Sequence, residues 1–191
     1  MLARDESILY AALTYRDRYT DGDYMPDQTN VYDGGCGCGE VRFRMESRPL
    51  IVHCCHCSWC QRQNGSAFAV NALIEADRVQ LLQGNVVDIE VPSPSGANQR
   101  ISRCPSCQVA VWSYYLVMFG GIGELVRFIR VGALDDPSRL PPDVHIFTAS
   151  KQPWVTLPPD IPAEEEYYVT EKTWSADSLA RRAVLLSSVQ R

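Results

Sequence analysis

The chain has 191 residues, of which 46% are hydrophobic and 21% are charged, and its formal net charge is −5. These values are typical of one soluble domain with extensions, and an acidic chain without a basic run argues against a nucleic-acid partner. The longest apolar stretches fall far short of the roughly 20 residues that cross a bilayer. We therefore expect a cytoplasmic protein with reduced thiols and without a membrane partner.

Residues 1–32 are expected to be an N-terminal extension. Ile8, Ala11, Tyr15 and Tyr19 recur at helical spacing, which predicts a short amphipathic helix. The residues that follow this helix are rich in turn formers.

Short strands separated by turns are predicted from residue 33 to residue 150. Residues 41–45 alternate apolar and charged side chains, as a half-buried strand does. Two strands within 79–91 surround Gln83-Gly84-Asn85, which predicts a hairpin. The other strands are predicted at 66–74, 109–115, 125–134 and 144–150. Because no long helix interrupts this region, we expect an antiparallel, mainly β domain.

The C-terminal part, residues 158–191, is a second extension. Prolines exclude regular structure from its first half, whereas Leu179, Ala183 and Leu186 form a helical stripe with Ser175 as N-cap. This helix is expected to pack either on the domain or on a second subunit, and the second placement would make the protein a homo-oligomer.

The eight cysteines fall into three groups, and the two outer groups predict a structural metal site. Cys36 and Cys38 form a CxC turn among glycines, and Cys104 and Cys107 form a CxxC knuckle. Each group supplies two thiolates, and a structural zinc takes four ligands in a closed tetrahedron. We expect a structural zinc that links these distant segments.

The middle group lies in the sequence CCHCSWC at 54–60. Once the outer four are paired, Cys55, Cys57 and Cys60 remain, and three ligands leave a position open for water or substrate. His53, Cys54 and His56 compete for that fourth position, and any of them would close the site. A disulfide or an iron–sulfur cluster remains an alternative.

Other side chains near the cysteine groups could have either a functional or a structural role. His53 or His56 could transfer a proton, but we favour a strand histidine without a catalytic role in each case, because the sequence shows no partner for either. Arg62 and Arg103 lie beside the cysteines and either balance thiolate charge, hold a substrate carboxylate, or are solvated. His145 and Trp154 are expected to be structural, with Trp154 packed over the sheet.

Five segments of the chain carry a family resemblance. They are GGCGCGEVRF at 34–43, CHCSWCQRQNGSAF at 55–68, RCPSCQVAVW at 103–112, VGALDDPSRLPPDVHIF at 131–147 and KQPWV at 151–155. In this order they resemble the glutathione-dependent formaldehyde-activating enzyme family, which includes centromere protein V. The resemblance covers residues 33–157, and Cys54 departs from it, because the family usually has another residue there.

The resemblance implies a β-tent fold, in which coiled antiparallel sheets surround two zinc sites. It places one structural zinc on Cys36, Cys38, Cys104 and Cys107 and one catalytic zinc on Cys55, Cys57 and Cys60, in agreement with the spacing. The implied activity is that of a carbon–sulfur lyase acting on a small molecule such as glutathione or a glutathione adduct. A zinc-dependent dehydratase or isomerase of a carbonyl metabolite and a non-catalytic zinc-stabilised binding module are alternatives.

Overall fold

The computed structural model describes residues 30–93, 96, 98–116 and 122–189. Its strands are β1 (Tyr32–Gly35), β2 (Arg42–Met45), β3 (Ile51–Cys55), β4 (Ala69–Glu75), β5 (Val79–Gln83), β6 (Val87–Val91), β7 (Gln99–Arg103), β8 (Ala110–Tyr115), β9 (Val126–Arg130) and β10 (Val144–Ile146). Its α-helices are α2 (Ser58–Asn64), α3 (Thr170–Thr173) and α4 (Ala176–Val189). Short 3-10 turns occur at Ala76–Arg78, Gly123–Leu125, Val131–Ala133, Pro137–Arg139 and Thr148–Ser150. The helix predicted in residues 1–32 lies outside the described residues.

The strands form two sheets, which confirms the prediction of a mainly β protein. A three-stranded sheet has the order β1-β2-β5, and a seven-stranded sheet has the order β10-β3-β4-β9-β8-β7-β6. All pairs are antiparallel except β10 with β3, which run parallel. The expectation of a purely antiparallel domain is therefore wrong at this one edge.

The apolar core consists of two clusters, one on each face of the large sheet. On one face, Val52 and Ile129 pack against the small sheet, whose Phe43 is fully buried. On the other face, Leu73 and Phe128 pack against residues from the C-terminal extension. Strand β3 is buried along its whole length, since both of its faces are covered.

The predicted hairpin around Gly84 is wrong, although both of its strands exist. Strand β5 pairs with β2 in the small sheet, whereas β6 pairs with β7 at the edge of the large one. Gly84 has a φ of +74°, and a Cβ there would lie 2.3 Å from the carbonyl oxygen of Glu40. The glycine therefore lets the chain pass close to another backbone segment and change sheets.

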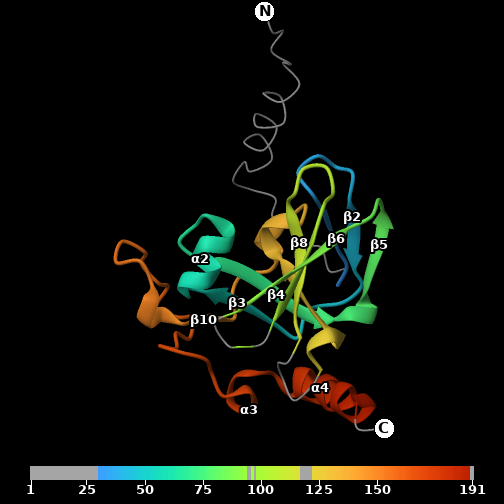
Figure 1. Cartoon of the computed structure of the whole chain (residues 1–191). Helices are drawn as coiled ribbons and strands as arrows, with labels where there is room; N and C mark the ends of the chain where they lie inside the picture. Colours follow the sequence, from blue (N-terminus) through green and yellow to red (C-terminus); the bar gives the residue numbers. More distant parts are fainter. Residues whose placement is uncertain (1–29, 94–95, 97, 117–121, 190–191) are drawn as a thin grey trace, which may run out of the picture.

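The C-terminal extension packs on the domain, which was one of the two placements predicted for its helix. Tyr168 and Trp174 are buried in the second core cluster, and Figure 1 shows α4 lying beneath the sheets. The side-chain oxygen of Ser175 accepts a hydrogen bond from the backbone N–H of Ser178, which confirms the predicted N-cap. The hydroxyl of Ser178 donates to the carbonyl of Leu50.

Two further expectations meet different outcomes. Trp154 is 71% exposed, so the prediction that it packs over the sheet is wrong; it lies in a turn directly after Pro153, outside any strand or helix. Strand β2 alternates as predicted, with Phe43 and Met45 buried and Arg42 and Arg44 half-buried. None of the described helices has the length and apolar character needed to cross a membrane.

An ion pair between Arg181 of α4 and Glu75 of β4 ties the helix to the large sheet. Two hydrogen bonds of 2.7 and 2.5 Å join the side chains, which are 14% and 6% exposed. We expect Arg181→Met to lower the free energy of unfolding by about 3 kcal/mol, because it leaves the buried Glu75 carboxylate with only the longer, 3.4 Å pair to the more exposed Arg78. The matched change Arg182→Met, which breaks a pair with the exposed Glu171, should cost less than about 1 kcal/mol. Urea unfolding curves for both variants would check this ranking, and equal losses would contradict it.

Candidate metal centres and cavity

The four outer cysteines come together at one place, as their spacing predicted. The sulfur atoms of Cys36, Cys38, Cys104 and Cys107 all lie within 4.8 Å of one another. Cys36 Sγ is 3.4 Å from Cys38 Sγ, which is 3.7 Å from Cys104 Sγ. Four thiolates around a tetrahedral zinc, at Zn–S distances of about 2.3 Å, are about 3.8 Å apart, so this cluster fits a closed zinc site.

The backbone around this four-cysteine cluster is arranged to stabilise thiolates. The N–H of Val41 donates to Cys36 Sγ at 3.2 Å, and a backbone hydrogen bond from Val109 lowers the pKa of Cys107 to about 6. Gln108 closes the Cys104 turn in the left-handed region, with a φ of +60°. None of the eight cysteines forms a disulfide, and all eight lie in the described residues.

The second cluster, Cys55, Cys57 and Cys60, forms where β3 runs into α2. Cys55 is the last residue of β3, and Cys57 is the N-cap of α2, where its Sγ accepts from the N–H of Cys60. The three sulfur atoms lie within 4.8 Å of one another. A strand end followed by the first turn of a helix thus places three thiols around one point, without a fourth protein ligand among the described residues.

Hydrogen bonds within this cluster already favour one thiolate. Bonds from Cys55 and Cys60 lower the pKa of Cys57 to about 2. The reciprocal bond, together with burial, raises the pKa of Cys55. Two thiols that share their protons with one thiolate are a set of ligands that a cation can take over by displacing those protons, so the cluster fits an open zinc site.

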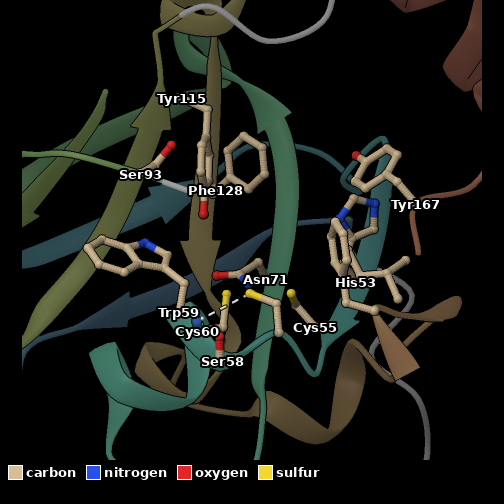
Figure 2. A pocket seen from close by; sticks show the side chains of 13 residues that line it. His53, Cys55, Ser58, Trp59, Cys60, Asn71, Ser93, Tyr115, Phe128 and Tyr167 are labelled. Carbon is tan, nitrogen blue, oxygen red and sulfur yellow. Dashed lines mark hydrogen bonds between the residues drawn. The ribbon is translucent and has the colours of Figure 1, made fainter. Parts of the chain in front are cut away.

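A cavity of about 410 Å³ opens beside the three-cysteine cluster. Figure 2 shows the sulfur atoms at one end of it, with Trp59 to one side, His53 and Tyr167 to the other, and Tyr115 and Phe128 facing them. Apart from the cysteine sulfurs, no Asp, Glu, Lys or Arg side chain lines this cavity among the described residues. A reacting group held at the cluster would therefore lie among aromatic rings, partly shielded from water.

His53 is held in this cavity by residues of the C-terminal extension. Its Nε2 is hydrogen-bonded to the hydroxyl of Tyr168. The oxygen of this hydroxyl accepts a further hydrogen bond, of 2.7 Å, from the indole N–H of Trp174. Burial lowers the pKa of His53 to about 3 and raises that of Tyr168 to about 12. The imidazole is therefore neutral near pH 7. Because the Tyr168 hydroxyl accepts hydrogen bonds from Tyr167 and Trp174, we assign its own proton to the bond with His53 Nε2, which leaves the ring proton on Nδ1.

Arg130 is a component of the site that sequence reasoning missed. It is 8% exposed, donates to Asn71 Oδ1 at 2.6 Å and to Gln63 Oε1 at 3.2 Å, and interacts electrostatically with Cys60. Its guanidinium offsets the negative charge of the thiolates. The available signal was a charged residue in the apolar strand LVRFIRV at 125–131, but only the fold shows which face Arg130 occupies.

The other predicted residues lie elsewhere. The side chain of Arg62 is exposed, and Arg103 donates to the carbonyl of Gln108; neither lines the cavity. Cys54 and His56 are buried but are not among the cavity-lining residues. Both lie close to His145 instead, so neither is the fourth ligand of the three-cysteine cluster.

The sequence of the chain is similar to known proteins of one family. The family model described as "Glutathione-dependent formaldehyde-activating enzyme" matches residues 31–150. A curated protein of Halomonas elongata, named "Putative glutathione-dependent formaldehyde-activating enzyme", is 30% identical over 131 residues, which are 66% of this chain and 81% of the relative. A solved Rhodobacter sphaeroides protein matches 54% of this chain and 87% of its own, with 16% identity and a TM-score of 0.39, and no argument rests on it.

The two cysteine clusters should respond differently to the loss of one ligand. We expect Cys57→Ser to lose one zinc equivalent relative to the wild type while it keeps the fold, because an open site adds little to chain linkage. Cys104→Ser should lose the fold, because the four-cysteine site joins segments far apart in sequence. Metal analysis and circular dichroism measure both effects. A stable Cys104→Ser protein with unchanged metal content would contradict the structural assignment.

Removal of the Arg130 charge should weaken metal binding at the three-cysteine cluster. For Arg130→Gln we expect zinc affinity there to fall about 10- to 100-fold, as is usual when a supporting residue around a metal site is lost. Chelator competition measures this affinity. Arg127→Gln on the same strand is the control, because Arg127 bonds to Tyr114 and to the Val79 carbonyl instead. Equal losses in both variants would argue against a role for the Arg130 charge.

Proposed function

The chain belongs to the glutathione-dependent formaldehyde-activating enzyme family, and from this premise we propose that it is a zinc-dependent carbon–sulfur lyase. In this proposal the enzyme forms and breaks the bond between a thiol sulfur and the carbonyl carbon of a small aldehyde. The observation that carries the proposal is the three-cysteine cluster at the wall of an aromatic cavity. A closed four-cysteine site alone would support only a structural role.

Cys55, Cys57 and Cys60 would hold the zinc ion, which would supply Lewis acidity at its open coordination position. Three thiolates and a divalent cation sum to a charge of −1, and Arg130 lies close enough to Cys60 to offset it. Thiolate ligands are soft and suit a further sulfur ligand. The chemistry of these residues therefore favours a thiol as one substrate.

The forward reaction forms one S–C bond, breaks the C=O π bond and moves the thiol proton to the former carbonyl oxygen. His53, which lines the cavity, would assist that oxygen. Because burial holds its pKa near 3, it would act as a neutral hydrogen-bond donor through Nδ1 rather than as a cation. Tyr168 and Trp174 would keep the ring in this tautomer, so they are positioning residues.

The cavity lining also bears on the substrate. Glutathione carries two carboxylates and an ammonium group, whereas no Asp, Glu, Lys or Arg side chain lines the cavity in the described part of the chain. Only the sulfur end of glutathione would therefore enter, with its charged ends outside. The same lining favours a second candidate function, in which a small apolar carbonyl compound binds alone and is dehydrated or isomerised.

Rates of carbon–sulfur bond exchange test the first candidate directly. With glutathione and formaldehyde, NMR exchange spectroscopy should show faster formation of the hydroxymethyl thioether with the zinc-loaded wild type than without enzyme. Cys57→Ser should lower the rate to the uncatalysed value, since the open position is lost. Arg62→Ala, an exposed change on the same helix, should keep the wild-type rate.

Ligand-dependent melting separates the two candidates. Glutathione should raise the melting temperature of the wild type if it binds to the folded protein. Stabilisation by small apolar aldehydes or ketones without any effect of glutathione would favour the second candidate. A wild-type protein that exchanges carbon–sulfur bonds no faster than Cys57→Ser would rule out the first.

A further inference from the structure

We propose that Cys54, His56 and His145 form a third metal site, separate from the two cysteine clusters. The proposal concerns residues that the function proposed above does not use. All three side chains are buried, with exposed fractions of 2%, 0% and 6%, and one ligand atom from each lies within 4.8 Å of the others. We refer to these residues as the Cys-His-His cluster.

Backbone pairing brings the cluster together from distant parts of the sequence. Strand β10 runs parallel to β3, in a register that places His145 beside Cys54. Side chains at paired positions of neighbouring strands point to the same face. His56 follows one residue after the end of β3, so its ring can reach the same point.

The spacing of the ligand atoms matches what a tetrahedral cation requires. Cys54 Sγ lies 3.5 Å from His56 Nε2, which lies 3.0 Å from His145 Nδ1. With Zn–S of about 2.3 Å and Zn–N of about 2.0 Å, tetrahedral geometry places sulfur and nitrogen about 3.5 Å apart and two nitrogens about 3.3 Å apart. A small rotation of one ring would bring the nitrogens to that separation.

The outer nitrogens of the two rings leave the inner ones available as ligands. Neither His56 Nδ1 nor His145 Nε2 has a hydrogen-bond partner among the described residues. Because no group of the described residues donates a hydrogen bond to either outer nitrogen, the ring protons can occupy these outer positions. Both inner nitrogens can present lone pairs to one cation, with the ring protons on the outer positions.

The surrounding backbone holds His56 in place before any ion binds. Its N–H donates to the carbonyl of Ile146 at 2.9 Å, and its carbonyl accepts hydrogen bonds from Gln61 Nε2 and Ser150 Oγ at 2.6 and 3.1 Å. The Phe68 ring lies 5.4 Å from the imidazole, between ring centroids. A preformed position lowers the conformational cost of metal binding.

The donor set indicates which metals the cluster would take. One soft thiolate and two imidazoles suit a borderline cation such as zinc rather than magnesium or calcium, which prefer oxygen ligands. Cys54 and His56 lie on one side of the large sheet, whereas Cys55 and His53 face the cavity on the other. Neither the structural nor the open zinc site can thus use these ligands.

Cadmium-113 NMR of the intact protein tests the proposal without any substitution. Apoprotein refilled with cadmium under reducing conditions should show three resonances, because the shielding of cadmium rises as nitrogen replaces thiolate sulfur. We expect one signal for four thiolates, one for three, and a third, more shielded signal for one thiolate and two imidazoles. Two resonances at saturation would overturn the proposal.

Zinc stoichiometry in matched variants provides a second, independent measurement. The wild type should bind three zinc ions per chain, and Cys54→Ala and His145→Gln should each bind two, with affinity at the lost site reduced more than about 100-fold. His53→Gln, a buried histidine on the opposite face of β3, should keep three. Cys57→Ser should lose a different ion and retain the most shielded cadmium signal. Unchanged zinc content in Cys54→Ala would overturn the proposal, even if the open site and its activity remain intact. If one of the two variants, Cys54→Ala or His145→Gln, fails to fold, the zinc content of the other variant and the cadmium NMR experiment decide the question.

Discussion

The arrangement of the candidate metal sites depends on strand β3, whose side chains point alternately to two faces that are both buried. Successive side chains of a strand point to opposite faces, so His53 and Cys55 line the cavity while Cys54 between them does not. In a strand with one face in water, Cys54 would be a solvent-exposed thiol. Here that face is buried: Val52 packs in the core cluster against the small sheet, and Cys54 lies next to His56 and to His145 from the neighbouring strand.

The same alternation organises charge around the three-cysteine cluster. Arg130 of β9 is paired with Asn71 of β4, which is in turn paired with His53. Cross-strand neighbours share a face, so an arginine, an amide and an imidazole form a row beside the thiols. The row offsets thiolate charge near Cys60 and leaves the rest of the cavity aromatic. The charge beside the thiols and the low polarity of the rest of the cavity therefore have one geometric origin.

A feature could be predicted from the sequence alone only where the residues that determine it are close together in the chain or of a rare type. Cysteine spacing separated the four-thiol group from the three-thiol group, and Ser175 marked a helix start, because both depend on residues that are close in sequence or of rare type. Strand pairing was misread at Gly84, since a glycine turn permits either a hairpin or a change of sheet. The place of Arg130 depends on which strand face is buried. The approach of His145 to Cys54 depends on a parallel pairing across some ninety residues, for which no local pattern exists.

The C-terminal extension contributes Tyr167 to the cavity wall and Tyr168 and Trp174 to the support of His53. These residues follow the last strand of the sheets, so they are synthesised after the residues of both cysteine clusters. Chains fold from the N-terminus during synthesis, so both cysteine clusters emerge before the wall that shields one of them. The wall of the cavity beside the three-cysteine cluster is therefore completed only after the residues of that cluster have been synthesised.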